Sequence, residues 1–431
     1  MKRAIVLMLV TGINIVALFI YQWYVVVALG AGVQSDAAFA SMVLPQLLLN
    51  VVSGSLSFVL VPMLATTADS DKLNAEVSNF LAALGLLFGT LAIGLFLAAP
   101  LWVPLTVPGF SEEGKAITVS LARIQLIGMF FTGIGAVPTS AYQARHRFVY
   151  PAASATIASV LSAAFLFVAL PRLGVAAAAW GLALRSFLQF VFQLPVAFPL
   201  MRPDWRDEKF RDALRKLRPL IFGTSYYKTD QLVDRLLVSM APAGVLSLLH
   251  LAQQMYAAAN QVFVTALAAP AVPVLAGQAS SGDQHAFRQK MMQTMKTLML
   301  LGALVFALIV FPGYYVFELV FGHGKLTPNE IRELWLIMIA FGGFWMMGLS
   351  GQILSTSFFA MSDTTTPTKV GVIGFTIGIA LKIAGFMLFG VWGVAISTGV
   401  YMAFNSLVMY WILNRRLRAG FAPAIAHRSA Q

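Results

Sequence analysis

The chain has 431 residues, 59% hydrophobic and only 11% charged, and its mean hydropathy of +0.81 excludes an ordinary soluble domain of this size. The absence of cysteine excludes disulfides, thiolate catalysis and zinc–thiolate sites. The formal net charge of +12 fits either nucleic acid or a membrane surface, so the positions of the basic residues must decide between them.

The first apolar run follows Lys2 and Arg3, and its length of about 25 residues exceeds that of a cleaved signal peptide. We therefore predict a signal anchor that stays in the membrane. Eleven further apolar segments give twelve predicted spanning helices, at approximately 4–28, 38–66, 77–103, 116–142, 150–170, 175–200, 219–241, 245–276, 291–311, 331–360, 368–389 and 392–413.

The basic residues follow the expected membrane topology. When the helices alternate from a cytoplasmic N-terminus, 20 of the 29 Lys and Arg fall on the cytoplasmic side, four on the external side and five within the membrane. This is the positive-inside bias, and it places both termini in the cytoplasm. No aromatic–basic module supports nucleic-acid binding.

A basic segment, "RPDWRDEKFRDALRKLR" at 202–218, divides the helices into two sets of six. We expect it to be an amphipathic cytoplasmic linker that lies along anionic membrane lipids. The predicted organisation is an N-lobe at 1–201, this linker, a C-lobe at 219–414 and a cytoplasmic tail at 415–431.

The two sets of six helices carry similar short sequences at matching places. "VPMLA" at 61–65 corresponds to "VPVLA" at 272–276, and Ala144 and Ala360 each stand seven residues before a proline. An even number of helices per repeat gives both lobes the same orientation, with a pseudo-twofold axis along the membrane normal. Such an all-α fold is typical of alternating-access transporters.

Enzymatic motifs are missing from the sequence. There is no P-loop, no HExxH and no dinucleotide fingerprint in a suitable context, and the five histidines have no metal-ligand spacing. We therefore expect a transporter with no metal and no cofactor, and not an enzyme.

Five cations lie within predicted spanning helices, namely Arg123, Arg185, Lys228, Arg235 and Lys382. Each costs at least roughly 2.5 to 3.5 kcal/mol at the centre of a bilayer unless it faces water or a partner. Arg123 stands near a helix end and fits snorkelling or helix packing. The other four predict a polar cavity that binds an anion such as a diphosphate, with structural ion pairing between helices as the alternative for Lys228 and Arg235.

The segment "SYYKTDQLVDRLLVSM" at 225–240 carries both signs of charge. At 100° per residue, a single helix places Lys228, Gln231 and Arg235 on one face and Asp230 and Asp234 on roughly the opposite one. The two acids then need cations from other helices, protons or metal ions. Amides in other membrane segments, Gln22, Asn50, Gln253 and Gln254, predict a lumen that hydrogen-bonds a sugar, or else contacts between helices.

Several stretches resemble the lipid II flippase family of the MurJ (MviN) type, in the superfamily of Wzx polysaccharide flippases and multidrug exporters. They include "GAGVQSDAAFASMVLPQLLLNVVSGSLSFVLVPML" at 30–64, "ARIQLIGMFFTGIGAVPTSAYQARHRFVYPAASATIAS" at 122–159 and "VDRLLVSMAPAGVLSLLHLAQQMYAAANQVFVTALAAPAVPVLAG" at 233–277. The resemblance implies a two-lobed bundle that moves an undecaprenyl-diphosphate-linked saccharide across the bacterial inner membrane. Asp36 and Arg123 lie in these matching stretches.

The sequence also departs from that family. Twelve helices are predicted where the family usually has fourteen, and family arginines are replaced by Gln22, by Leu49 and Asn50, and by Gln254. The resemblance places Asp234 where some members resemble a sodium site, and Lys382 near an acid of that site. We therefore expect a shortened, divergent member.

Three functions are compatible with these observations. The leading one is a monomeric flippase for a polyprenyl-diphosphate-linked glycan, coupled to Na+ or H+, with a glycan polymerase or glycosyltransferases as candidate partners. In it, Lys228, Arg235, Arg185 and Lys382 bind the diphosphate, and Asp234 and Asp230 couple the cycle by pairing with Lys382, a proton or sodium. The alternatives are a cation-coupled multidrug exporter and a glycan polymerase or ligase. The short external loops disfavour the polymerase or ligase.

Overall fold

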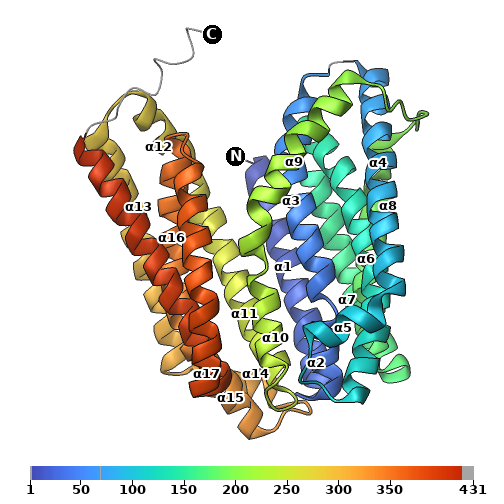
Figure 1. Cartoon of the computed structure of the whole chain (residues 1–431), viewed down its shortest axis with the longest axis vertical. Helices are drawn as coiled ribbons and strands as arrows, with labels where there is room; N and C mark the ends of the chain where they lie inside the picture. The colour runs from blue at the N-terminus through green and yellow to red at the C-terminus, as the bar shows by residue number, and fades with distance from the viewer. Residues whose placement is uncertain (1, 68, 420–431) are drawn as a thin grey trace. The chain divides into compact units, whose positions relative to one another are not determined.

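The computed structural model describes residues 2–67 and 69–419, and the regular structure in these residues is entirely helical, as predicted (Figure 1). Positions 420–431 of the predicted tail lie outside the described residues. The helices of the first part are α1 (Lys2–Leu29), α2 (Val33–Ala40), α3 (Val43–Ala65), α4 (Ser70–Leu97), α5 (Ala99–Thr106), α6 (Glu112–Ala144), α7 (Val149–Leu173), α8 (Ala176–Gln193), η1 (Leu194–Ala197), α9 (Glu208–Lys228) and α10 (Asp230–Val238). Those that follow are α11 (Val245–Phe263), the π-helix η2 (Val264–Ala268), α12 (Ala269–Ser280), α13 (Gln284–Val310), α14 (Gly313–Phe321), α15 (Pro328–Ala340), α16 (Gly342–Ala360) and α17 (Thr365–Ala419).

The chain folds into two compact units. The first contains Met1–Ser247 and the short segment Gly324–Leu326, and the second contains Leu248–His323 and Thr327–Gln431. The short segment belongs to the first unit because the backbone N–H of Lys325 donates to the carbonyl of Val27 at 2.8 Å. The lobes predicted at 1–201 and 219–414 rest on sequence repetition rather than on packing, and they remain a prediction.

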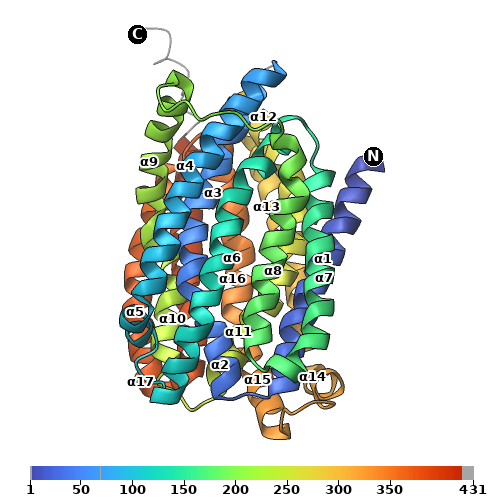
Figure 2. The same ribbon diagram turned by 90° about the vertical axis from the view of Figure 1, so that its right-hand side faces the viewer.

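Helix α6 is central to the first unit and packs against α3, α4 and α8 (Figure 2). A Cβ added to Gly128 of α6 would lie 3.3 Å from the Cα of Ala183 in α8. One turn further along, Thr132 donates a hydrogen bond to the Ser186 hydroxyl at 2.9 Å. Small residues and interhelical hydrogen bonds are what hold helices together where lipid removes the hydrophobic driving force.

The basic segment at 202–218 is integrated into the first unit. Helix α9 begins inside it, with the Asp207 carboxylate accepting the N–H of Phe210 at 2.8 Å. Phe210, Ala213 and Leu217 are buried in the same core as α3, α4 and α6, and the Phe210 ring lies 5.0 Å from the ring of Phe80. The segment thus packs along one face while the opposite face of its helix, with Arg211 and Arg215, is exposed.

The predicted seventh helix, 219–241, is not one continuous helix. α9 ends at Lys228 and α10 begins at Asp230, with Thr229 between them. The Thr229 hydroxyl donates to the carbonyl of Tyr226 at 2.7 Å, so the side chain competes with the helical backbone at this point. The expectation of a single helix across 225–240 is therefore wrong.

The second unit is built largely on α13, α16 and α17. The Trp345 indole N–H of α16 donates to the carbonyl of Gly302 in α13 at 3.0 Å. The backbones of α16 and α17 approach closely at Gly343 and Gly399, where an added Cβ would lie 3.0 to 3.3 Å from the facing backbone. The core of this unit uses the same small-residue packing as the first.

Helix α17 contains two helices joined at a sharp turn. Gly390 has φ +59° and ψ −139°, a conformation that favours glycine because it lacks a Cβ. This position separates the predicted helices 368–389 and 392–413, so the expected turn between them is confirmed.

Eight helices of the described residues are long and apolar enough to cross a membrane, or nine if the pair Val245–Ala268 and Pro270–Ser280, bent by 43°, forms one span. Twelve were predicted from the sequence. Part of the difference comes from counting α17 as one helix and from the break at Thr229. The multi-pass character is confirmed, whereas the twelve-helix layout and cytoplasmic termini remain predictions.

Candidate functional site

Arg235 is the most deeply buried arginine of the predicted site. Its side chain in α10 is only 4% exposed, and the adjacent Asp234 is 2% exposed. Asp234 and Asp36 both act electrostatically on its guanidinium. The predicted separation of a cationic from an acidic face does not describe this site, because it assumed a continuous helix and did not include Asp36.

Asp36, which the sequence singled out only through the resemblance, lies at the N-terminus of α11. Its carboxylate accepts the backbone N–H of Gly244 at 2.6 Å and that of Ser247 at 2.7 Å. A carboxylate is stabilising here because helix N-termini carry unpaired N–H groups and a partial positive charge. Gly244 has φ +97°, and a Cβ at this position would lie 2.7 Å from the backbone of Ala31. Asp36 therefore joins α2 to the α10–α11 turn.

A small cavity of about 110 Å³ adjoins this carboxylate. It is lined by Asp36, Ser111 and Ser239 together with glycine, alanine and apolar side chains. The Ser111 hydroxyl accepts the N–H of Gly114 and caps α6. The cavity is polar and roomy enough for a few water molecules beside Asp36.

Lys228 and Asn50, both predicted site residues, are brought together. The Lys228 ammonium donates to the backbone carbonyl of Asn50 at 2.6 Å. The Asn50 side chain itself is exposed, as is that of Gln231. Lys228 thus ties the end of α9 to α3, and its partner is a carbonyl rather than a carboxylate.

Arg185 forms a third polar group with α1 and α7. Its Nε–H donates to the Ser159 hydroxyl at 2.8 Å, and Ser159 donates to the Asn14 side-chain oxygen at 2.7 Å. Among residues 2–67 and 69–419, no carboxylate forms an ion pair with Arg185. This half-buried cation is positioned by a hydroxyl and an amide, and no carboxylate of the described residues neutralises its charge.

Lys382 lies in the second unit and is fully buried, with its ammonium 5.5 Å from the centre of the Tyr401 ring. A cation over an aromatic face is attracted by the ring quadrupole. Since Asp234 belongs to the first unit, its pairing with Lys382 stays a prediction.

The remaining predicted residues lie in different surroundings. The Nε–H of Arg123 donates to the carbonyl of Phe96 at 3.3 Å, as expected for a helix-packing role. Gln22 is half-buried, and its side-chain oxygen has no hydrogen-bond partner among the described residues. Gln253 and Gln254 are half-buried on α11, and Asp230 is half-buried at the start of α10.

Sequence reasoning missed Ser159 and Tyr401, which contact two of the predicted cations. Both are common residues of membrane helices, so no local pattern singles them out. In the described residues, no three His, Cys, Asp or Glu side chains gather in a way that would hold a metal ion.

A family model described as lipid II flippase MurJ matches residues 25–431. The probable lipid II flippase MurJ of Vibrio cholerae is 23% identical over 435 residues, covering 95% of this chain and 82% of the relative. The lipid II flippase MurJ of Burkholderia cenocepacia is 25% identical over 413 residues, covering 90% and 79%.

Two solved structures have a similar fold. Lipid II flippase MurJ in an inward closed conformation matches with a TM-score of 0.82 and 20% identity, over 95% of this chain and 87% of that one. An inward-facing multidrug resistance MATE family transporter of the MOP superfamily matches with a TM-score of 0.79 and 14% identity, over 96% and 98%. Since the family model covers nearly the whole sequence, this chain is a multi-pass protein of the bacterial inner membrane and belongs to the MurJ lipid II flippase family.

Proposed function

We propose that the chain flips an undecaprenyl-diphosphate-linked oligosaccharide across the inner membrane by alternating access, and that this cargo is a surface-glycan precursor rather than lipid II. Family membership already makes it a flippase for a lipid-linked precursor. The observation that carries the diphosphate site is Arg185, a half-buried cation that no carboxylate neutralises among the residues described.

A diphosphate suits such a cation. Phosphate oxygens accept charge-assisted hydrogen bonds, and the planar guanidinium can meet two of them at once. Ser159, which itself donates to Asn14, accepts the Nε–H of Arg185, and this leaves the far end of the guanidinium for a ligand. Lys228, Arg235 and Lys382 belong to the same proposed diphosphate set.

The preference for a surface glycan rests on three replaced positions. Where the family resemblance places arginines, this chain has Gln22, Asn50 with Leu49, and Gln254. An amide hydrogen-bonds a sugar but supplies no charge to a diphosphate. We infer that the cations at other positions take over part of that task, and that the saccharide recognised differs from that of lipid II.

Asp234 and Asp230 are the proposed coupling residues. Asp234 is buried beside Arg235, so a proton or a sodium ion at this carboxylate would change the charge that Arg235 experiences. Protonation would free Arg235 to bind an anion more strongly. Each transport cycle would then link ion movement to substrate affinity.

The proposal is tested in vesicles that contain the purified chain and fluorescent undecaprenyl-diphosphate oligosaccharide, with lipid II in a parallel set. Arg185→Gln should abolish flipping of the oligosaccharide, while Arg145→Gln, an exposed charge at the end of α6, should leave it unchanged. Lipid II flipped faster than the oligosaccharide would refute the surface-glycan cargo. Full activity of Arg185→Gln would refute the anion site.

The multidrug exporter is a second candidate because the MATE transporter shares the fold over nearly the whole chain. Such an exporter would use Asp230 and Asp234 for cationic drugs. Buried Arg235 and Lys382 disfavour this, since they repel a cationic drug. Drug efflux from cells that express the chain, lost in Asp234→Asn, would favour the exporter.

A further inference from the structure

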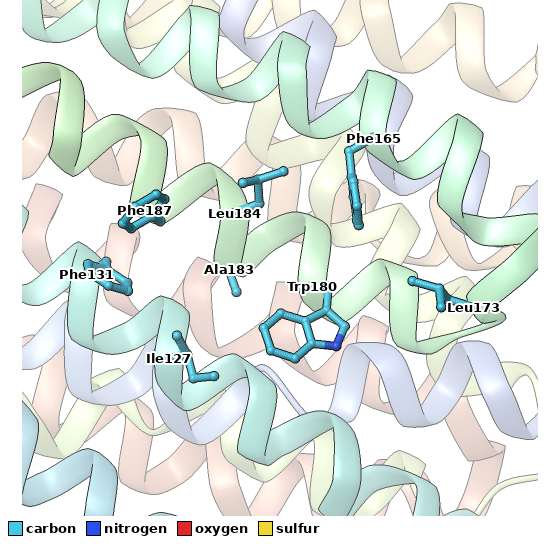
Figure 3. A pocket seen from close by; sticks show the side chains of 8 residues that line it. All are labelled: Ile127, Phe131, Phe165, Leu173, Trp180, Ala183, Leu184 and Phe187. Atoms are coloured by element: carbon cyan, nitrogen blue, oxygen red, sulfur yellow. The ribbon is translucent and has the colours of Figure 1, made fainter.

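Two grooves lie next to each other on the first compact unit. One, of about 440 Å³, is formed by α6, α7 and α8 and is lined by Ile127, Phe131, Trp180 and Phe187, among others (Figure 3). The other, of about 430 Å³, is formed by α4 and α6 and also contains Ile127 and Phe131. These two side chains form a ridge between the channels, and we call the pair of channels the twin groove.

The α4–α6 channel of the twin groove is nearly as long as the hydrocarbon part of one leaflet is thick. From Arg123 to Phe131 along α6, eight residues at 1.5 Å each give about 12 Å. Half of a hydrocarbon core is about 15 Å thick. The α4–α6 channel can therefore hold one extended stretch of hydrocarbon chain without crossing the bilayer midplane.

A single cation marks one end of the twin groove. Arg123 is a wall residue of the α4–α6 channel, and its guanidinium lies 4.9 Å from the centre of the Phe96 ring, near the end of α4. Among the described residues, no carboxylate pairs with Arg123, and only its Nε–H has a protein acceptor. An arginine has five N–H donors, so the others point to a ligand or to solvent.

Trp180 lies in the α6–α7–α8 channel, at the same end of the twin groove as Arg123. It stands in the first turns of α8, three residues before Ala183, which lies against Gly128 of α6. Trp180 is 43% exposed. Half-exposed tryptophan and arginine side chains are typical of the level of lipid headgroups.

We propose that the twin groove binds one diacyl anionic phospholipid of the bilayer, with its phosphate at Arg123 and one acyl chain on each side of the Ile127–Phe131 ridge. Arg123 lines the α4–α6 channel, Trp180 lines the other channel, and the two channels share the Ile127–Phe131 ridge, so two acyl chains that leave one phosphate near Arg123 can occupy both. Within the part of the chain that the structure describes, Arg123 is the only charged wall residue of the two channels, so charge complementarity selects an anionic headgroup over a zwitterionic one. None of the residues assigned to the glycan carrier lines this site.

The test is native mass spectrometry of the full-length purified chain, mixed with phosphatidylglycerol or with phosphatidylcholine of the same acyl chains. The wild type should retain one phosphatidylglycerol in preference to phosphatidylcholine. Arg123→Gln should lower phosphatidylglycerol retention about fivefold, as expected for one basic side chain at an anionic headgroup. Arg145→Gln removes the same charge from the other end of α6 and should retain the lipid as the wild type does.

Two further variants separate binding from folding. Arg123→Lys keeps the charge and should retain most of the phosphatidylglycerol, whereas Ile127→Trp fills the channels and should lose it while Arg123 is intact. Equal retention of the two lipids by the wild type would overturn the proposal. So would phosphatidylglycerol retention by Arg123→Gln or by Ile127→Trp at the wild-type level.

Discussion

Arg235 and Arg185 both lie inside the first compact unit, but in opposite electrostatic surroundings. Arg235 is almost fully buried and lies within electrostatic reach of Asp234 and Asp36. Arg185 is held by the Ser159 hydroxyl, with no carboxylate paired to it in the part of the chain that the structure describes. The difference teaches that the stability cost of replacing a buried cation depends on whether nearby carboxylates already balance its charge.

The largest expected effect is a loss of stability on replacing Arg235, the cation whose charge the nearby carboxylates balance. Arg235→Ala leaves Asp234 and Asp36 buried without their cation, and removing one partner of such a group costs about 3 to 5 kcal/mol. Thermal unfolding in detergent should show a large fall in Tm, with Arg235→Lys much closer to the wild type. A Tm unchanged by Arg235→Ala would break the comparison.

Asp36 and Arg235 should be energetically coupled. Asp36→Asn weakens the cap of α11 and should lower the free energy of unfolding by about 1 to 2 kcal/mol. In the Arg235→Gln background, Asp36→Asn should lower the free energy of unfolding by less, because the carboxylate charge that it removes no longer has the Arg235 cation to balance. A double-mutant cycle of unfolding in denaturant measures this, and strictly additive costs would contradict the pairing.

Arg185 should show the reverse pattern of large functional and small structural effects. Arg185→Gln removes a charge that no carboxylate of the described residues balances, so the free energy of unfolding should change by no more than about 1 kcal/mol. Flipping in vesicles should nevertheless be lost. If Arg185→Gln were as destabilised as Arg235→Ala, the two arginines would not differ in how far carboxylates balance their charge.

A partly exposed ion pair in the second unit, between Asp363 and Arg416, should give the smallest effect and provides a pH-dependent reference. Burial alone would raise the pKa of Asp363, but hydrogen bonds from Thr366 and the nearby Arg416 outweigh it and lower the pKa below its ordinary value of 3.8. The stabilisation is therefore present above about pH 4 and is lost as pH falls through the folded-state pKa. Asp363→Asn should cost about 0.2 to 1 kcal/mol at pH 7, and this difference from the wild type should disappear in strong acid. Thermal unfolding of both proteins across this pH range is the measurement, and a difference that grows in acid would contradict it.

The sequence predicts the long helices well, because membrane segments need apolar runs that are easy to recognise. It also places the turn at Gly390, where glycine accommodates a positive φ. The break at Thr229 was missed, since threonine occurs inside many membrane helices and the flanking Lys228, Asp230 and Gln231 fit the faces of a single helix as well as they fit a break.

The site was only partly predictable. Composition identified Arg235, Arg185 and Lys382 as costly charges, since burying a cation in a membrane requires an explanation from any fold. It could not identify their neighbours. Asp36 caps a helix that begins more than 200 residues later in the chain, and a contact of that kind depends on tertiary packing alone.

The packing of Phe210 and Leu217 against α3 and α4 sets an order of events during synthesis of the chain. Residues 1–201 emerge first, but the core between α3 and α4 stays open until α9 has been made and inserted against it. Translation at roughly 5 to 20 residues per second makes this delay a matter of seconds. During that time the apolar side chains that will pack against α9 are accessible to insertion factors or to the wrong helices. Residues 1–201 made alone would lack part of their own core.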